Sequence, residues 1–141
     1  MQIEFRRLRE DVPVPEYKTA GAVAFDLAVI EGATLASGER MLLPTGLVVR
    51  VPEGHALILA SRSSNAKKGI RLANSVGVID QDYSGPEDEL RIAVHNFGSE
   101  PYTIEKYDRI AQGLIVPIAR ATFVEPQDWD GSNRGGFGTT G

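Results

Sequence analysis

The segment from Asn74 to Tyr83, NSVGVIDQDY, runs from an apolar stretch directly into two carboxylates and an aromatic ring. In an extended chain the side chains alternate between two faces, so Asp80 and Asp82 share one side. A buried carboxylate near a phosphate can orient a water molecule and take its proton. The segment therefore predicts a general base for hydrolysis, and the alternative is a hairpin with turn-forming aspartates.

A second group, Ser61 to Ser64, lies where a predicted strand ends and a short predicted helix begins. Free backbone N–H groups at the start of a helix, together with hydroxyls and a guanidinium, suit a polyphosphate. The alternative is an ordinary helix N-cap beside a surface arginine.

Two further segments carry weaker signals. Tyr107–Gln112 is a charged entry to an apolar strand, and Arg134–Gly141 is a glycine-rich tail with one Arg, one aromatic ring and two hydroxyls. Glycines let backbone amides approach phosphate oxygens, but the tail has no Gly-Lys-Ser/Thr ending. The alternatives are an ordinary strand start and a disordered terminus.

The elements that must position these residues are predicted to be strands. Apolar residues come in short clusters rich in Val, Ile and Leu, separated by Gly, Pro, Asn and Asp, which is typical of an all-β fold. The one helix expected is Ser63–Lys68, capped by Ser63 or Ser64 and ended by Gly69 in a left-handed conformation. Besides the strand that leads into Asp80, we expect strands near Ile3–Leu8, Phe25–Val29, Arg40–Leu43, Leu47–Val51, His55–Ala60, Leu90–His95, Tyr102–Ile104, Ile110–Pro117 and Ala121–Val124.

Composition narrows the class of protein. A chain of 141 residues, 42% hydrophobic, can form one domain with its own core. A net charge of −4 argues against a nucleic-acid surface, and the absence of cysteine with only two, well-separated histidines leaves no obvious zinc site. The N-terminus lacks the apolar run of a signal peptide, and no stretch is apolar enough to span a membrane, so we expect an intracellular protein with no membrane partner.

The chain is expected to divide into a β-domain and a tail. Residues 1–130 are predicted to form one β-domain, and residues 131–141 a flexible lid, because the tail contains five glycines and only one large apolar residue, Phe137. Such a segment cannot bury enough apolar area to order itself without a ligand.

Five segments, taken together and in this order, resemble the five motifs of the trimeric dUTPase family over nearly the whole chain. They are Gly21–Leu27, Ser61–Ser64, Gly77–Tyr83, Arg109–Gln112 and Gly136–Gly141. The resemblance implies a distorted β-barrel or jelly-roll-like subunit in a homotrimer with active sites at the subunit interfaces. It also implies that the C-terminal arm of one subunit crosses to a neighbour and closes over the nucleotide.

The activity implied by the resemblance is hydrolysis of dUTP to dUMP and pyrophosphate, which limits uracil incorporation into DNA and supplies dUMP for thymidylate synthesis. Asp80 would orient the water that attacks the α-phosphorus. Tyr83 would pack on the deoxyribose and leave no room for a 2′-hydroxyl. The cofactor implied is Mg²⁺, held mainly by the triphosphate and waters, with Asp26 reaching it through water.

The remaining substrate-binding residues implied by the resemblance divide by the part of dUTP that they meet. Asn74 and the backbone at Gly77 and Ile79 would read the uracil edge, and Phe137 would stack on the base. The residues expected at the phosphates are Arg62, Ser63, Ser64, Gln112, Gly138, Thr139 and Thr140. Arg109 is not included among them, because an arginine at the start of a strand can simply pair with a neighbouring subunit.

The chain departs from the family pattern in a few places. Ala24 and Ser64 stand where the motifs usually have Gly, and neither change removes a reacting group. Ser132 stands where the tail usually has Arg, which leaves Arg134 as the candidate for the γ-phosphate. The segment Gly85–Glu89 is longer than the family pattern, and we expect its acids to form a solvated hairpin tip rather than a second metal site.

Two other functions are possible for a chain with these motifs. A dCTP deaminase of the same fold would need an arginine at Lys67 and a glutamate near Ala93, and both are absent. A non-catalytic, dUTP-dependent interaction module would not require Asp80, Tyr83 and Phe137 together, because binding alone needs no base.

Overall fold

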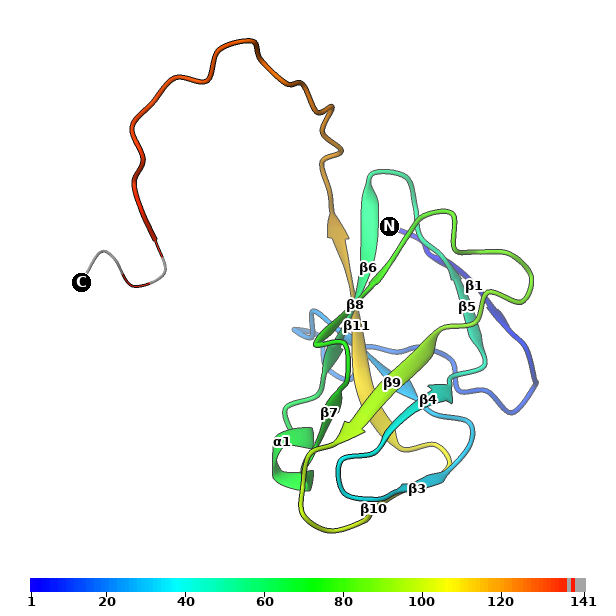
Figure 1. Cartoon of the computed structure of the whole chain (residues 1–141). Coiled ribbons are helices and arrows are strands. Elements are labelled where there is room, and N and C mark those ends of the chain that lie inside the picture. The colour runs from blue at the N-terminus through cyan, green and yellow to red at the C-terminus, as the bar shows by residue number, and fades with distance from the viewer. Residues whose placement is uncertain (137, 139–141) are drawn as a thin grey trace.

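The computed structural model describes residues 1–136 and 138, and these form a nearly all-β subunit with one short helix, α1 (Figure 1). The helix spans Asn65–Lys68. The strands are β1 (Glu4–Arg7), β2 (Phe25–Ala28), β3 (Ala33–Leu35), β4 (Arg40–Pro44), β5 (Leu47–Arg50), β6 (His55–Ser61), β7 (Ile70–Leu72), β8 (Val76–Ile79), β9 (Arg91–Asn96), β10 (Tyr102–Ile104) and β11 (Arg109–Pro117).

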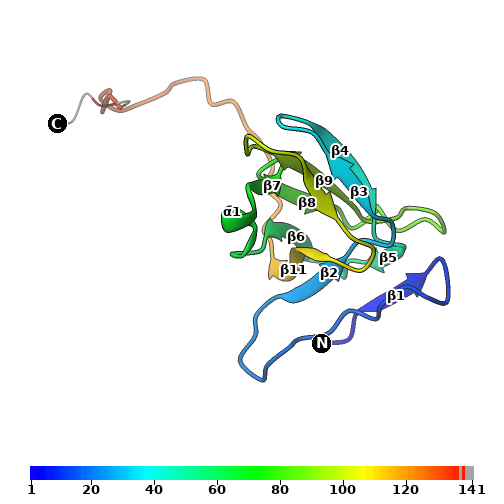
Figure 2. The same cartoon turned by 90° about the horizontal axis from the view of Figure 1, so that it is seen from below.

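Two larger sheets and two strand pairs build the subunit (Figures 1 and 2). One sheet has the strand order β2-β11-β6-β8 and the other β4-β9-β7, and all of their pairings are antiparallel. The pairs are β1 with β5 and β10 with β3. Buried side chains of both larger sheets, such as Leu57 and Ile92, belong to one hydrophobic core, so the chain carries a single folded body.

The longer predicted strands are confirmed, and the differences have simple causes. The strands β3 and β7 were not predicted; a strand of three residues gives a weak alternation signal, and of the three strands this short among the described residues only β10 was predicted. The strand predicted at Ala121–Val124 is wrong: Phe123 is 95% exposed and Val124 78% exposed, in a segment with no strand or helix. Its β-branched and aromatic residues have no neighbouring strand to pair with in this chain.

The helix is shorter than predicted at its N-terminal end. It begins at Asn65, and Ser64 occupies the predicted N-cap position, but its side chain makes no capping hydrogen bond. The predicted end is confirmed, since Gly69 has φ 70° and its N–H bonds back to helix carbonyls. The Asn65 side-chain amide donates to the carbonyl of Ile110 at 2.6 Å, which fixes the helix to β11.

After β11 the chain leaves the folded body. The arm from Ile118 to Gly136 contains no strand or helix and projects away from the sheets (Figures 1 and 2). In the part of the chain that the structure describes, no helix is long and apolar enough to cross a membrane.

Asp11 fastens the N-terminal segment to the turn before β11. Its carboxylate accepts hydrogen bonds from Arg9, from the Lys106 ammonium at 2.9 Å and from the Tyr107 hydroxyl at 3.0 Å. These donors, Arg9 first, hold the pKa of Asp11 well below its usual range. The contribution to stability is therefore present above the pKa of an unfolded Asp and disappears as the pH falls through the lower folded-state pKa.

We predict that Asp11→Asn lowers the Tm at neutral pH, because a neutral amide replaces the charged carboxylate that accepts hydrogen bonds from three side chains. The Tm difference from the wild type should shrink as the pH falls below about 4, where unfolded Asp begins to take up a proton. Thermal unfolding at a series of pH values measures it. Glu10→Gln is the matched control, and a Tm difference for Asp11→Asn that does not change with pH would contradict this account.

Candidate active site

The first cluster of predicted residues forms where β2, β6 and β11 lie side by side. Asp26 of β2 is opposite Gln112 of β11, and Gln112 is opposite Ala60 of β6. Arg62 follows the end of β6, and its guanidinium lies 2.9 Å from the Asp26 carboxylate. Antiparallel pairing therefore brings three of the sequence motifs to one place.

Asp26 is shared by two arginines. Arg109 reaches its other oxygen at 3.1 Å, and Arg62 also donates to the Arg109 carbonyl at 3.0 Å. The Asp26 side chain is only 13% exposed, against 29% for Arg62 and 45% for Arg109. Two cations and one anion leave one net positive charge at a partly exposed position, which suits a polyphosphate.

Three other residues of the first cluster offer polar groups. Gln112 donates its amide to the Ser61 carbonyl at 3.1 Å, next to Arg62. The Ser64 hydroxyl oxygen is buried and has no hydrogen-bond partner among the described residues. Ser63 is exposed. A buried hydroxyl without a partner is costly, so Ser64 holds an unused hydrogen-bonding group two residues after Arg62.

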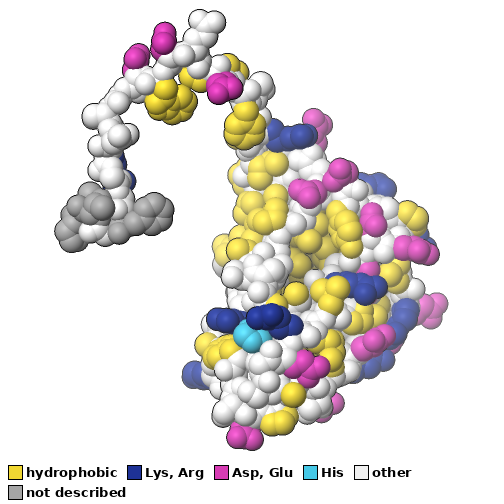
Figure 3. Space-filling model, in the orientation of Figure 1, with side chains coloured by type: hydrophobic (Ala, Val, Ile, Leu, Met, Phe, Trp, Pro, Cys, Tyr) yellow, Lys and Arg dark blue, Asp and Glu magenta, His cyan; other side chains and the backbone are white. Residues whose placement is uncertain are grey.

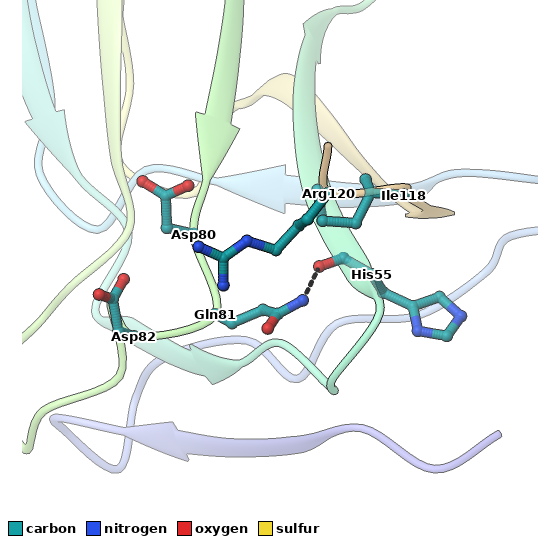
Figure 4. Close-up of a pocket in the computed structure, with 7 residues that line it drawn as sticks. His55, Asp80, Gln81, Asp82, Ile118 and Arg120 are labelled. Atoms are coloured by element: carbon teal, nitrogen blue, oxygen red, sulfur yellow. Dashed lines mark hydrogen bonds between the residues drawn. The ribbon is translucent and has the colours of Figure 1, made fainter. Parts of the chain in front are cut away.

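The second cluster surrounds Asp80, which directly follows β8. Asp80 and Asp82 line a surface cavity of about 430 Å³ (Figure 4). Their carboxylates lie on one side of the segment, while Gln81 points the other way and donates to the His55 carbonyl at 3.1 Å. The alternation that the sequence predicted is present, but Asp80 is exposed rather than buried in this chain.

A smaller cavity of about 110 Å³ lies between β8, with the turn that precedes it, and β9. It is lined by Asn74, Gly77 and Ile79, with Arg91 and Ile92 from the facing strand. Gly77 faces Leu59 of β6, where an added Cβ would lie 3.0 Å from the Leu59 Cβ, so any larger residue would crowd the Leu59 side chain. The three residues predicted to read the base thus share one small cavity.

Asp80 and Arg62 lie at opposite ends of β6. Ile79, just before Asp80, pairs with Leu57 near the start of β6, whereas Arg62 follows its end. With about 3.3 Å per residue, the seven residues of β6 separate the ends by about 20 Å. A single chain therefore does not bring Asp80 and Arg62 together.

The tail residues are apart from both clusters. Arg134 and Gly138 lie on the exposed arm, and among the described residues none forms a hydrogen bond or ion pair with Arg134. Phe137, Thr139 and Thr140, predicted to contact the substrate, lie outside the described residues.

Some residues of the second cluster were not found from the sequence. His55, Ile118 and Arg120 line the larger cavity because β6 pairs with both β8 and β11. Arg91 lines the smaller one from β9. Their only signal is the strand register, which a single sequence does not reveal.

The side chains of residues 1–136 and 138 can be compared with the ligand sets that metal ions require. Among the described residues there is no group of three or more His, Asp or Glu side chains that could hold an ion. Both oxygens of Asp26 are bonded to arginines, so its carboxylate is not free for direct coordination.

Comparisons with known proteins agree with this geometry. Residues 10–141 match the family model described as dUTPase. The chain is 44% identical over 138 residues to the deoxyuridine 5′-triphosphate nucleotidohydrolase of Methylocella silvestris, covering 93% of this chain and 84% of that protein. It is 40% identical to the protein of the same name from Neisseria gonorrhoeae, covering 100% of this chain and 97% of that one.

Solved structures show the same fold. The dUTPase of Streptococcus mutans has a TM-score of 0.77 at 32% identity, covering 87% of this chain and 100% of that one. The Staphylococcus bacteriophage 80alpha dUTPase with dUpNHpp has a TM-score of 0.87 at 24% identity, covering 99% and 98%, which supports the fold alone. The predicted jelly-roll-like fold is confirmed, and the chain belongs to the dUTPase family.

Proposed function

We propose that the chain hydrolyses dUTP to dUMP and pyrophosphate, and that Asp80 orients and deprotonates the attacking water. This proposal is supported by where the family motifs lie in the fold. One group contains two arginines paired with Asp26, and the other contains the Asp80 carboxylate beside a small cavity. The product dUMP feeds thymidylate synthesis, and removal of dUTP limits uracil incorporation into DNA.

Each cluster takes a different part of the nucleotide. Arg62, Ser63, Ser64 and Gln112 bind the phosphates, with Asp26 holding the Arg62 guanidinium in place. Asn74 and the backbone at Gly77 and Ile79 read the uracil edge in the smaller cavity, and Tyr83 packs on the deoxyribose. Asp80 then takes the proton of a water in line with the α-phosphorus.

Mg²⁺ fits this site as an ion carried by the substrate. When bound, the ion would neutralise part of the triphosphate charge. Its preferred ligands are oxygens of the phosphates and of water. Because Asp26 is bonded to two arginines, its contact with the ion runs through water.

The complete site is formed between copies of the chain, in a homotrimer. Supporting this, Asp80 and Arg62 lie at opposite ends of β6, and the edge strand β8 carries exposed Val76 and Val78. Hydrophobic side chains gather below the base of the arm, over the region of β6, β8 and β11 (Figure 3). A second copy that covers this face brings its own arginine cluster to Asp80.

The arm closes the site. Residues 1–130 form the β-domain and 131–141 the lid, in which Phe137 stacks on uracil while Gly138, Thr139 and Thr140 approach the phosphates and Arg134 the γ-phosphate. The length of exposed arm beyond β11 supports a reach to a neighbouring subunit (Figure 1).

The substrate is tested by incubating the protein with Mg²⁺ and each of dUTP, dCTP, dTTP and UTP. We predict pyrophosphate and dUMP from dUTP alone, because cytosine inverts the donor and acceptor pattern and ribose carries a 2′-hydroxyl. Ammonia released from dCTP would point to the deaminase instead, and binding of dUTP without turnover to an interaction module.

For the base, we predict that Asp80→Asn lowers kcat by roughly 10²–10⁴ with little change in dUTP affinity, because the amide keeps the shape but cannot accept the proton. Steady-state kinetics and binding of a non-hydrolysable analogue measure the two effects. Asp82→Asn is the matched control. A larger loss in Asp82→Asn than in Asp80→Asn would reassign the base.

For the shared site, we predict that co-assembling Asp80→Asn with Arg62→Ala subunits restores activity that neither variant has alone. In a random equal mixture, about one site in four combines the intact Asp80 of one chain with the intact Arg62 of another. Activity of separately purified and co-expressed trimers measures this. Asp80→Asn mixed with an Asp80→Asn/Arg62→Ala double variant is the negative control, and no recovery in the first mixture would contradict a shared site.

A further inference from the structure

The segment between Tyr83 and β9 is only partly the solvated tip that the sequence predicted. Glu87 is exposed, but Glu89 is only 8% exposed and is the one buried acid among the described residues. A buried carboxylate is costly unless it is hydrogen-bonded, so its partners show what it does.

The Glu89 carboxylate is bonded to the turn between β4 and β5. It accepts the backbone N–H of Gly46 at 2.5 Å, and Arg91 lies 3.5 Å from its second oxygen. Gly46 has φ 69°, and a Cβ there would lie 2.4 Å from Val12, so this turn has little freedom to move. The side chain of Glu89 is thus fixed to a rigid part of the fold.

The main chain of Glu89 holds Tyr83. The Tyr83 hydroxyl donates to the Glu89 carbonyl at 2.9 Å. Between them, Asp88 closes a turn by accepting the N–H of Gly85 at 2.7 Å. Glu89 therefore connects two parts of the fold. Its side chain is bonded to the β4–β5 turn, and its carbonyl is bonded to the Tyr83 hydroxyl.

We propose that Glu89 is a positioning residue for sugar discrimination: its buried carboxylate anchors the carbonyl that fixes the Tyr83 ring against the deoxyribose. This inference rests on the proposed role of Tyr83. Steric exclusion of a 2′-hydroxyl works only if the ring cannot give way, and the Tyr83 side chain is itself half exposed. The hydrogen bond from the Tyr83 hydroxyl to the Glu89 carbonyl therefore restrains the ring where packing does not.

The test measures kcat/KM for dUTP and for UTP, with Mg²⁺, in the full-length protein. Glu89→Ala leaves the Gly46 N–H without its acceptor, so we expect the dUTP/UTP ratio to fall by about tenfold, mainly through a gain with UTP, while kcat for dUTP stays close to the wild type. Glu89→Gln keeps an oxygen acceptor and should retain most of the discrimination.

Two comparisons separate positioning from loss of stability. Thr45→Val removes a hydroxyl that donates to the Leu90 carbonyl at 2.6 Å in the same turn, and should lower the Tm without changing the ratio. Tyr83→Phe should lower the ratio by itself, and adding Glu89→Ala to it should lower the ratio no further, because both act through one hydrogen bond.

Each outcome bears on a different proposal. A wild-type protein that does not hydrolyse dUTP refutes the proposed function. A wild-type protein that does, with an unchanged ratio in Glu89→Ala, refutes only the role of Glu89. Equal losses in Thr45→Val and Glu89→Ala would also refute it. If Glu89→Ala does not fold, the dUTP/UTP ratio of Tyr83→Phe tests the proposal. An unchanged ratio in Tyr83→Phe would refute it, because the hydrogen bond of the Tyr83 hydroxyl would then have no effect on discrimination.

Discussion

Strand β6 pairs with β8 on one side and with β11 on the other, and this double pairing sets the geometry of everything functional in the chain. Leu57 and Leu59 of β6 are buried in the core, so the strand is held along its length. An extended, doubly paired strand cannot shorten. The Asp80 end and the Arg62 end therefore keep a fixed separation, and the rigidity that builds each cluster also prevents a single chain from joining them.

The same reasoning explains the arrangement around Asp26. A lone arginine on a strand end loses conformational entropy when it binds a phosphate. Asp26 holds Arg62 and Arg109 before any ligand arrives, and it is itself buried enough for these ion pairs to keep their orientation. The carboxylate that the sequence associated with a metal thus has a direct structural task, which is to orient two guanidinium groups and leave a net positive charge at this end of β6.

The sequence predicted the fold class and the longer strands because their hydrophobic clusters and turn residues are local signals. It did not predict β3 or β7, whose three residues give only a weak period, although it predicted the equally short β10, and it placed a strand at Ala121–Val124, where the structure has none. Asp26, Arg62 and Gln112 were found as separate motifs, but only strand register shows that they meet. Glu89 was misjudged because an acid in a Gly-Pro-rich loop normally faces water; its partner, the Gly46 N–H, is a backbone group that no sequence pattern marks.

Asp80 is exposed in the isolated chain, although a general base next to a polyphosphate gains from a site that excludes bulk water. One chain contains a continuous hydrophobic core, whereas the cavity at Asp80 is open at the surface. In the proposed trimer, the second subunit supplies the arginines and the arm supplies the cover. Folding then depends on strand pairing within one chain, whereas catalysis depends on contacts between chains in the trimer. The exposed valines of β8 are consistent with this division, because an edge strand with apolar residues facing water is tolerated where another copy covers it.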